Sequence, residues 1–193
     1  TPPAPTASHS LPRPQIRAAQ LPSGEGLFDD AARLAALHAW SAVGDPSHCM
    51  TSLVHSFLCL GSITCLADDP AALAAEVTDL ERGRTKGLYL ITEVGQSNSH
   101  LATRTLARFD AGAREFVLES PDAGAAKFCS AGTRGIPQTA VVLARLSVGG
   151  TDRGVFGFVV PLTDSRGPLP GVEISSPLAL SALPLDYVQV RFR

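Results

Sequence analysis

The stretch Gly87-Leu88-Tyr89-Leu90-Ile91-Thr92-Glu93 (residues 87–93) begins where the hydrophobic pattern of this 193-residue chain changes. Before it, apolar residues recur at the three- and four-residue spacing of helices. After it, they form short runs that are separated by turn residues. The sequence therefore predicts an α+β fold in which a short N-terminal helical layer is followed by a small antiparallel β-barrel or sandwich.

Six short strands are expected after Gly87. The segments Asp110–Ala113 and Gly149–Asp152 have the composition of hairpin turns. The predicted strands are Leu88–Thr92, Thr103–Phe109, Glu115–Glu119, Thr139–Leu146, Val155–Val160 and Tyr187–Phe192. Six strands at this spacing are typical of a small barrel or sandwich.

Three helices are expected before Gly87. The first follows the capping residues Asp29 and Asp30 and runs to about Val43, the second covers about Ser47 to Leu66, and the third runs from Asp69-Pro70 to about Arg82. The second helix is apolar nearly all round and has no charged residue, so its length approaches that of a membrane span. Its Ser, Thr, His and Gly residues favour a buried core helix over a membrane helix.

These patterns divide the chain into three parts. Residues 1–22 form a proline-rich arm with five prolines in the first 14 positions, residues 23–86 form the helical domain, and residues 87–193 form the β-domain. Simple disorder of the arm is favoured over an extended strap on a partner.

Composition and spacing argue against several classes of partner and site. The 16 basic and 18 acidic residues are mixed along the chain, so no footprint for nucleic acid or an anionic membrane is expected. The four cysteines lack metal-ligand and disulfide-scaffold spacing, and the histidines lack metal-ligand spacing. We therefore expect reduced thiols, no metal site, no signal peptide and a cytoplasmic protein.

The loop after Thr92 offers limited ligand chemistry when its residues are considered alone. Gly95 stands without the further glycines of a dinucleotide-binding fingerprint, which argues against a Rossmann site. The polar loop could present backbone and side-chain donors to a planar or anionic ligand. An ordinary strand-to-loop connection is the favoured alternative on the residues alone.

The order of several motifs carries a family resemblance. Tyr89–Gly95 is similar to a Y/F-x-x-T-E-x-G signature, and Lys127–Gly132 falls where the same family has K-x-W-[IP]-x-[NG]-G. From about residue 27 to residue 193, the chain resembles the acyl-CoA dehydrogenases and acyl-CoA oxidases. Further matching runs are Asp45–Ser47, Thr105–Asp110, Glu115–Leu118, Val141–Leu146, Gly154–Pro161 and Pro168–Val172.

The resemblance implies an FAD site. It assigns Thr92 to a hydrogen bond with the flavin pyrimidine edge and Tyr89 and Ile91 to backbone contacts with the ring. It also assigns a wall near the flavin N5 to Cys129, Ser130, Ala131 and Gly132, with Ala131 offering its backbone N–H. The substrate, an acyl-CoA or an acyl carrier thioester, would be contacted by Gly95, Asn98 and Ser99.

Three departures from the family pattern modify these expectations. Ser97 replaces a loop glycine, and Cys129 replaces the tryptophan of many members, which implies a roomier or differently filled flavin pocket. The family continues beyond the β-domain into a helical domain that supplies the catalytic glutamate, whereas this sequence stops at Arg193. We therefore assign no catalytic residue here, and expect a partner chain with that domain, an exposed apolar face and an oligomer.

Three functional hypotheses remain open. The first is a subunit or fragment of a flavin-dependent acyl-CoA dehydrogenase or oxidase within a hetero-oligomer, in which another chain or a missing segment supplies the base. The second is a non-catalytic binding or scaffold subunit that retains the fold. The third is a flavin-independent hydratase or carrier-protein-binding module.

Overall fold

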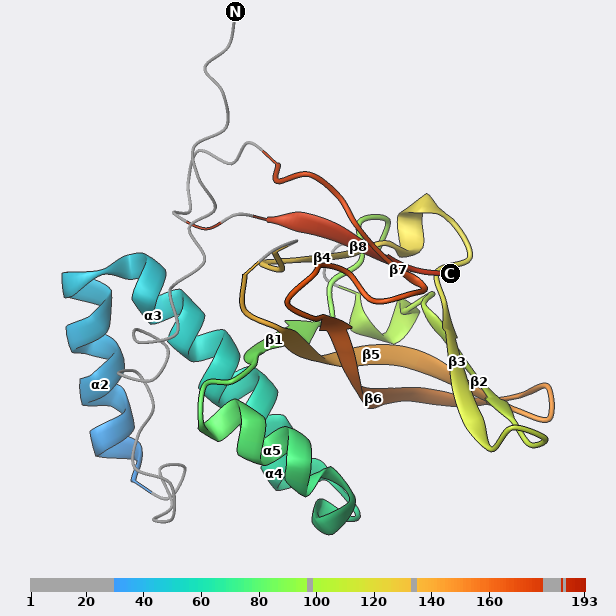
Figure 1. Cartoon of the computed structure of the whole chain (residues 1–193), viewed down its shortest axis with the longest axis horizontal. Helices are drawn as coiled ribbons and strands as arrows, with labels where there is room; N and C mark the ends of the chain where they lie inside the picture. The colour runs from blue at the N-terminus through green and yellow to red at the C-terminus, as the bar shows by residue number, and fades with distance from the viewer. Residues whose placement is uncertain (1–29, 97–98, 133–134, 179–184, 186) are drawn as a thin grey trace, which may run out of the picture.

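The computed structural model describes residues 30–96, 99–132, 135–178, 185 and 187–193. The arm that was predicted over residues 1–22 lies outside the described residues. Helices gather on one side of the molecule and strands on the other (Figure 1). The predicted α+β class, with a helical layer followed by a β-domain, is confirmed.

The helical layer contains the three helical segments that the sequence predicted. The first is α2 (Ala31–Gly44), and the second is a continuous stretch of α3 (Pro46–Ser52), η2 (Leu53–Leu60) and α4 (Gly61–Leu66). The third joins η3 (Pro70–Leu73) to α5 (Ala74–Glu81). The carboxylates of Asp30, Asp45 and Asp69 accept backbone N–H groups at the three starts, as N-caps do.

The second helical segment, Pro46–Leu66, is long and apolar enough to cross a membrane. In this fold, 44% of its most apolar window is buried. Its central part, η2, is a π-helix, and three residues of this part, His55, Ser56 and Cys59, are buried. The segment thus contributes to a protein core, as the sequence analysis expected of a core helix.

The larger of two sheets is built around β5 (Gln138–Val148). The long strand β6 (Thr151–Thr163) pairs antiparallel along almost all of β5, so it occupies one edge of that strand. Consequently β1 (Lys86–Leu90) and β2 (Leu106–Asp110) share the other edge, and both run parallel to β5. β3 (Glu115–Glu119) extends the sheet antiparallel to β2.

This sheet is therefore mixed, where the sequence analysis had expected antiparallel pairing throughout. The reason is that the chain leaves β5 after Leu90 and pairs with the same edge again from Leu106 on, so that β2 runs in the same direction as β1.

The smaller sheet is antiparallel, in the order β4 (Lys127–Cys129), β8 (Val188–Phe192) and β7 (Val172–Ile174). The sequence analysis missed β4 and β7, because three residues are too few to show an alternating pattern.

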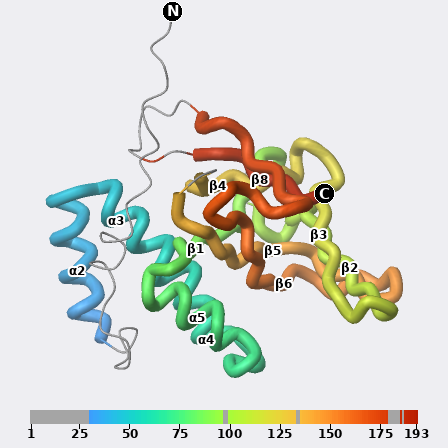
Figure 2. Tube along the Cα trace, viewed as in Figure 1, coloured from blue at the N-terminus to red at the C-terminus, as the bar shows by residue number. Residues whose placement is uncertain are grey.

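The two faces of the larger sheet pack against different layers. Leu88 and Leu90 of β1 point toward the smaller sheet, whereas Tyr89 between them packs toward the helices. Figure 2 shows the same arrangement as a tube along the chain, in which α4 and α5 lie on one side of β1 and β5 and β8 lies on the other. The core between the sheets includes Ala140, Val142, Leu162, Val188 and Val190, and the core under the helices includes Cys59, Ile63, Leu80 and Val141.

The helical layer meets β1 most closely at Gly87. The imidazole Nδ1 of His55 accepts the Gly87 backbone N–H at 2.7 Å, and burial lowers the pKa of His55 to about 4, so the ring is neutral and free to accept. The thiol of Cys59 donates to the Thr139 carbonyl at 3.7 Å. A Cβ atom at Gly87 would lie 2.9 Å from the Cys59 Cβ and 3.1 Å from the His55 Nδ1. A glycine is therefore required here by the close approach of helix and strand.

Gly87→Ala should destabilise the fold by about 1–3 kcal/mol, because the added methyl group would have to displace η2 from β1. Urea unfolding followed by circular dichroism measures this change. Gly44→Ala is the matched control, since a Cβ atom at Gly44 meets nothing within 4 Å and should leave the free energy of unfolding nearly unchanged. Equal midpoints for the two variants would contradict the packing argument.

Candidate functional site

Two segments that are distant in the sequence run side by side at the end of β1. The Phe128 N–H donates to the Thr92 carbonyl at 3.0 Å, and the Val94 N–H donates to the Ala126 carbonyl at 3.0 Å. The structure therefore brings the predicted residues Tyr89, Ile91 and Thr92 beside the strand that leads into the predicted wall of residues 129–132.

A buried ion pair joins these two segments. The Lys127 ammonium lies 3.0 Å from the Glu93 Oε1, and both side chains are almost fully buried, with exposures of 0% and 1%. The carboxylate also accepts the Arg104 N–H at 2.8 Å, the Thr105 N–H at 2.8 Å and the Thr105 hydroxyl at 2.7 Å. Lys127 donates in addition to the Ile91 carbonyl at 3.2 Å.

This environment keeps Glu93 ionised. Burial favours the neutral acid, but the hydrogen bonds from Thr105 and Arg104 and the charge of Lys127 outweigh it, so the pKa of Glu93 is lowered. Burial lowers the pKa of Lys127, which the Glu93 carboxylate opposes. Glu93 accepts from four donor groups, so it is a structural acceptor and not a free base.

The predicted wall turns Cys129 and Ala131 inward. Both side chains are buried in the core between the two sheets. Burial raises the pKa of the Cys129 thiol to about 12, and the backbone of Ala131, whose N–H the resemblance assigned to the flavin, acts in the opposite direction. Cys129 thus contributes to the core here, and the inference of a roomier or differently filled flavin pocket stays a prediction.

Other backbone groups of the wall are also engaged within the protein. The Gly132 N–H donates to the Gln138 Oε1 at 2.9 Å, and the Gln138 Nε2 donates back to the Gly132 carbonyl at 2.8 Å. The Lys86 ammonium donates to the Ser130 carbonyl at 3.0 Å. These bonds fix the backbone of the wall in place.

Two hydroxyl groups of the predicted flavin set remain available. The side chains of Thr92 and Ser130 are partly exposed, and neither hydroxyl hydrogen-bonds within the part of the chain that the structure describes. They lie on the two segments that pair at Thr92 and Phe128. The residues therefore fit a flavin in one respect: these two hydroxyls could hydrogen-bond the polar edge of the flavin ring.

The structure gives no comparable set of available groups at the described residues, Gly95 and Ser99, that were predicted to contact the substrate. Gly95 packs against Gly124, where a Cβ atom would lie 3.0 Å from the Gly124 Cα, and its N–H donates to the Gly124 carbonyl at 2.8 Å. Packing thus explains this glycine without a ligand. Ser99 is exposed, with its N–H donating to the Gln96 carbonyl. Asn98 and Ser97 lie outside the described residues.

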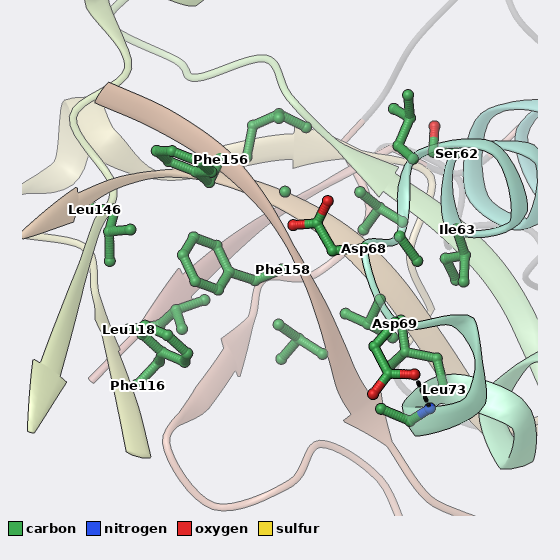
Figure 3. Close-up of a pocket in the computed structure, with 18 of the residues that line it drawn as sticks. Ser62, Ile63, Asp68, Asp69, Leu73, Phe116, Leu118, Leu146, Phe156 and Phe158 are labelled. Atoms are coloured by element: carbon green, nitrogen blue, oxygen red, sulfur yellow. Dashed lines mark hydrogen bonds between the residues drawn. The ribbon is translucent and has the colours of Figure 1, made fainter. Parts of the chain in front are cut away.

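A groove beside Tyr89 was not foreseen from the sequence. It has a volume of about 990 Å³ and lies between the α4–η3 corner and strands of the larger sheet (Figure 3). Its apolar lining includes Ile63, Leu73, Phe116, Phe156 and Phe158. Phe156 and Phe158 on β6 could have indicated this groove in the sequence, because they are apolar, alternate along one strand and had no assigned partner.

The described residues 30–96, 99–132, 135–178, 185 and 187–193 hold no group of three or more His, Cys, Asp or Glu side chains that could bind a metal ion.

Comparisons with known proteins find relatives that are named as acyl-coenzyme A oxidases. No family model matches the chain. The human peroxisomal acyl-coenzyme A oxidase 3 is 30% identical over 155 residues, which are 79% of this chain and 22% of the human protein. A putative peroxisomal acyl-coenzyme A oxidase 1.2 from Arabidopsis thaliana is 36% identical over 90 residues, or 46% of this chain and 14% of the relative.

Solved structures agree on the fold. Acyl-CoA oxidase 1 from Yarrowia lipolytica superposes with a TM-score of 0.75 at 23% identity, covering 86% of this chain and 25% of that one. Acyl-CoA oxidase-1 from Caenorhabditis elegans, solved in complex with FAD and ATP, gives 0.65 at 25% identity over 95% of this chain and 30% of that one. The chain spans less than a third of the length of each of these four proteins.

Glu93→Gln should cost about 3–5 kcal/mol of stability, because it leaves the buried Lys127 charge unpaired and turns an amide NH₂ toward backbone donors. Lys127→Met should cost less, since Glu93 keeps its bonds from Arg104 and Thr105. Denaturant midpoints measure both changes. Glu119→Gln, which breaks an exposed ion pair with Arg108, should cost less than about 1 kcal/mol. A Glu93→Gln variant as stable as Glu119→Gln would refute the role of the buried pair.

Proposed function

We propose that this chain, which is related in sequence and in fold to part of the acyl-CoA oxidase family, forms the flavin-facing portion of an enzyme that dehydrogenates acyl thioesters between Cα and Cβ. The observation that carries the proposal is the pair of hydroxyls of Thr92 and Ser130, which make no hydrogen bond to the described residues and lie on segments that run side by side. The cofactor in this proposal is FAD, because the C. elegans relative was solved with it.

The chain's own contribution is to bind and orient. The hydroxyls of Thr92 and Ser130 would hydrogen-bond the polar edge of the flavin, which is costly to bury without partners. The buried Glu93–Lys127 pair would keep the Thr92 segment in position, and the bonds of Gln138 and Lys86 would do the same for residues 130–132. FAD, when bound, supplies the acceptor for the hydride.

The base that removes the α-proton is proposed to lie outside these 193 residues. Glu93 is held in its ion pair, and Glu119 and Glu173 pair with Arg108 and Arg193 on exposed strands. Glu115 lies at the groove, on β3. We therefore propose a base on a partner chain or another segment of helical structure, in an oligomer that acts on an acyl-CoA or acyl carrier thioester. The proposed location is the cytoplasm, although the human and Arabidopsis relatives are named as peroxisomal.

A second candidate is a non-catalytic scaffold subunit. The observation in its favour is that backbone groups of the wall are already hydrogen-bonded within the protein, Gly132 to Gln138 and the Ser130 carbonyl to Lys86. FAD binding separates the two candidates, since a scaffold has no need of the Thr92 and Ser130 hydroxyls.

Thr92→Val should weaken FAD retention by about 1–3 kcal/mol in the assembled protein, since it removes a hydroxyl while keeping the side-chain shape. Flavin occupancy and the absorbance spectrum provide the measurement. Thr64→Val, at an exposed position of α4, is the control and should leave occupancy unchanged. Unaltered occupancy and spectrum in Thr92→Val would remove this residue from the flavin site.

The purified 193-residue chain with added FAD should not turn over an acyl-CoA. A positioned general base commonly contributes on the order of 10²–10⁴ in rate, and none of the described carboxylates is free to act beside Thr92. Dye reduction with an acyl-CoA substrate tests this expectation. A partner with the helical portion should restore turnover. Dye reduction by the chain alone at a rate typical of enzymes would contradict the proposal that the base lies elsewhere.

A further inference from the structure

The outer edge of β6 is unpaired. Within the described residues, β6 pairs with β5 alone, and no strand lies along its other edge from Thr151 to Pro161. Figure 1 shows β6 at the outer side of the larger sheet. The edge segment Val155–Val160 has no charged residue and is bounded by Arg153-Gly154 and Pro161. A long apolar edge strand with free backbone groups is a template for another strand.

The groove follows this free edge. Every residue from Val155 to Pro161 lines it, although consecutive residues of a strand point to opposite faces. Val159 pairs with Val141 and packs toward the helices, while its neighbour Phe158 pairs with Val142, which faces the smaller sheet. A cavity that is lined by both faces of β6 must pass along its edge, where backbone groups are accessible.

The groove has acidic residues at its rim and no basic residue in its lining. Asp68, Asp69 and Glu115 are exposed and line it, and no Lys or Arg is among the described lining residues. In Figure 3, Phe116, Phe156 and Phe158 lie across the groove from Ile63 and Leu73, with Asp68 between the two groups. Asp68 and Glu115 have no ion-pair partner among the described residues, whereas seven ion pairs form elsewhere.

We propose that β6 and this groove are a docking site for an extended segment of a partner polypeptide. The segment adds to β6 as a further strand, places alternate apolar side chains in the groove and presents Lys or Arg to Asp68, Asp69 and Glu115. Backbone hydrogen bonds along the edge provide affinity, and the groove and its acidic rim provide selectivity. The site is independent of flavin chemistry and goes beyond the proposed function.

The charge of the rim distinguishes this occupant from a small ligand of the proposed reaction. A fatty carboxylate or the phosphates of an acyl-CoA would be repelled by three carboxylates with no compensating cation. Phe116 and Phe156 are 50% and 48% exposed, which leaves apolar area for a protein partner to cover.

The test uses a fluorescent peptide with alternating valine and threonine and a lysine at each end, titrated into the 193-residue chain at low salt. We expect saturable binding, together with slowed amide hydrogen exchange in Val155–Val160 and unchanged exchange in β7, which does not line the groove. The same peptide with glutamate at each end, and one with N-methylated backbone amides, should bind at least about tenfold more weakly. The N-methylated peptide keeps the side chains and removes the strand hydrogen bonds.

Variants of the protein complete the test. Asp68→Lys combined with Glu115→Lys should weaken binding of the lysine peptide about tenfold, and Glu81→Lys, an exposed acidic position outside the groove, should not. Equal binding of the N-methylated peptide, protection of amides outside β6 and the groove, or helical circular dichroism of the bound peptide would overturn strand addition. Displacement of the peptide by an acyl-CoA would show that the groove is a small-ligand site.

Discussion

The buried ion pair between Glu93 and Lys127 is the interaction on which the arrangement of the β-domain depends. Removing two charges from water is costly, and the pair is tolerated because the carboxylate accepts three further hydrogen bonds from Arg104 and Thr105. These bonds join the loop after β1, the start of β2 and the strand β4 at one point. The position of Thr92, the central residue of the proposed flavin contact, follows from that junction.

A second constraint sets the helical layer on the sheet. η2 approaches β1 so closely that Gly87 has no room for a side chain, and His55 uses its neutral imidazole to satisfy the Gly87 N–H. The helical cover of the sheet therefore differs along its length. At Gly87 η2 lies in close contact with β1, whereas beyond Leu66 the corner at Asp68 and Asp69 leaves the groove along β6 open.

The similarity to acyl-CoA oxidases indicates which cofactor to propose, whereas the contacts within this chain indicate which of its groups could bind that cofactor. The relatives are similar to this chain in sequence and in fold over less than a third of their own length, and the FAD complex of one of them is the reason to propose this cofactor. The described residues of this chain contribute a narrower set of contacts, because Gln138 and Lys86 already hydrogen-bond backbone groups of Gly132 and Ser130 in the wall. Both the enzyme and the scaffold interpretation draw on these facts.

The sequence by itself determined the element types, because hydrophobic period, helix caps and turn residues are local signals. It placed the helix starts at Asp30, Asp45 and Asp69 and the strands β3 and β8 within a residue or two. Tertiary structure alone decided that β1 and β2 run parallel to β5, that Glu93 and Lys127 meet, that Cys129 turns into the core and that β6 pairs on one edge alone among the described strands. These features join residues that are tens of positions apart, and no local pattern specifies which strand edges pair or which buried charges find each other.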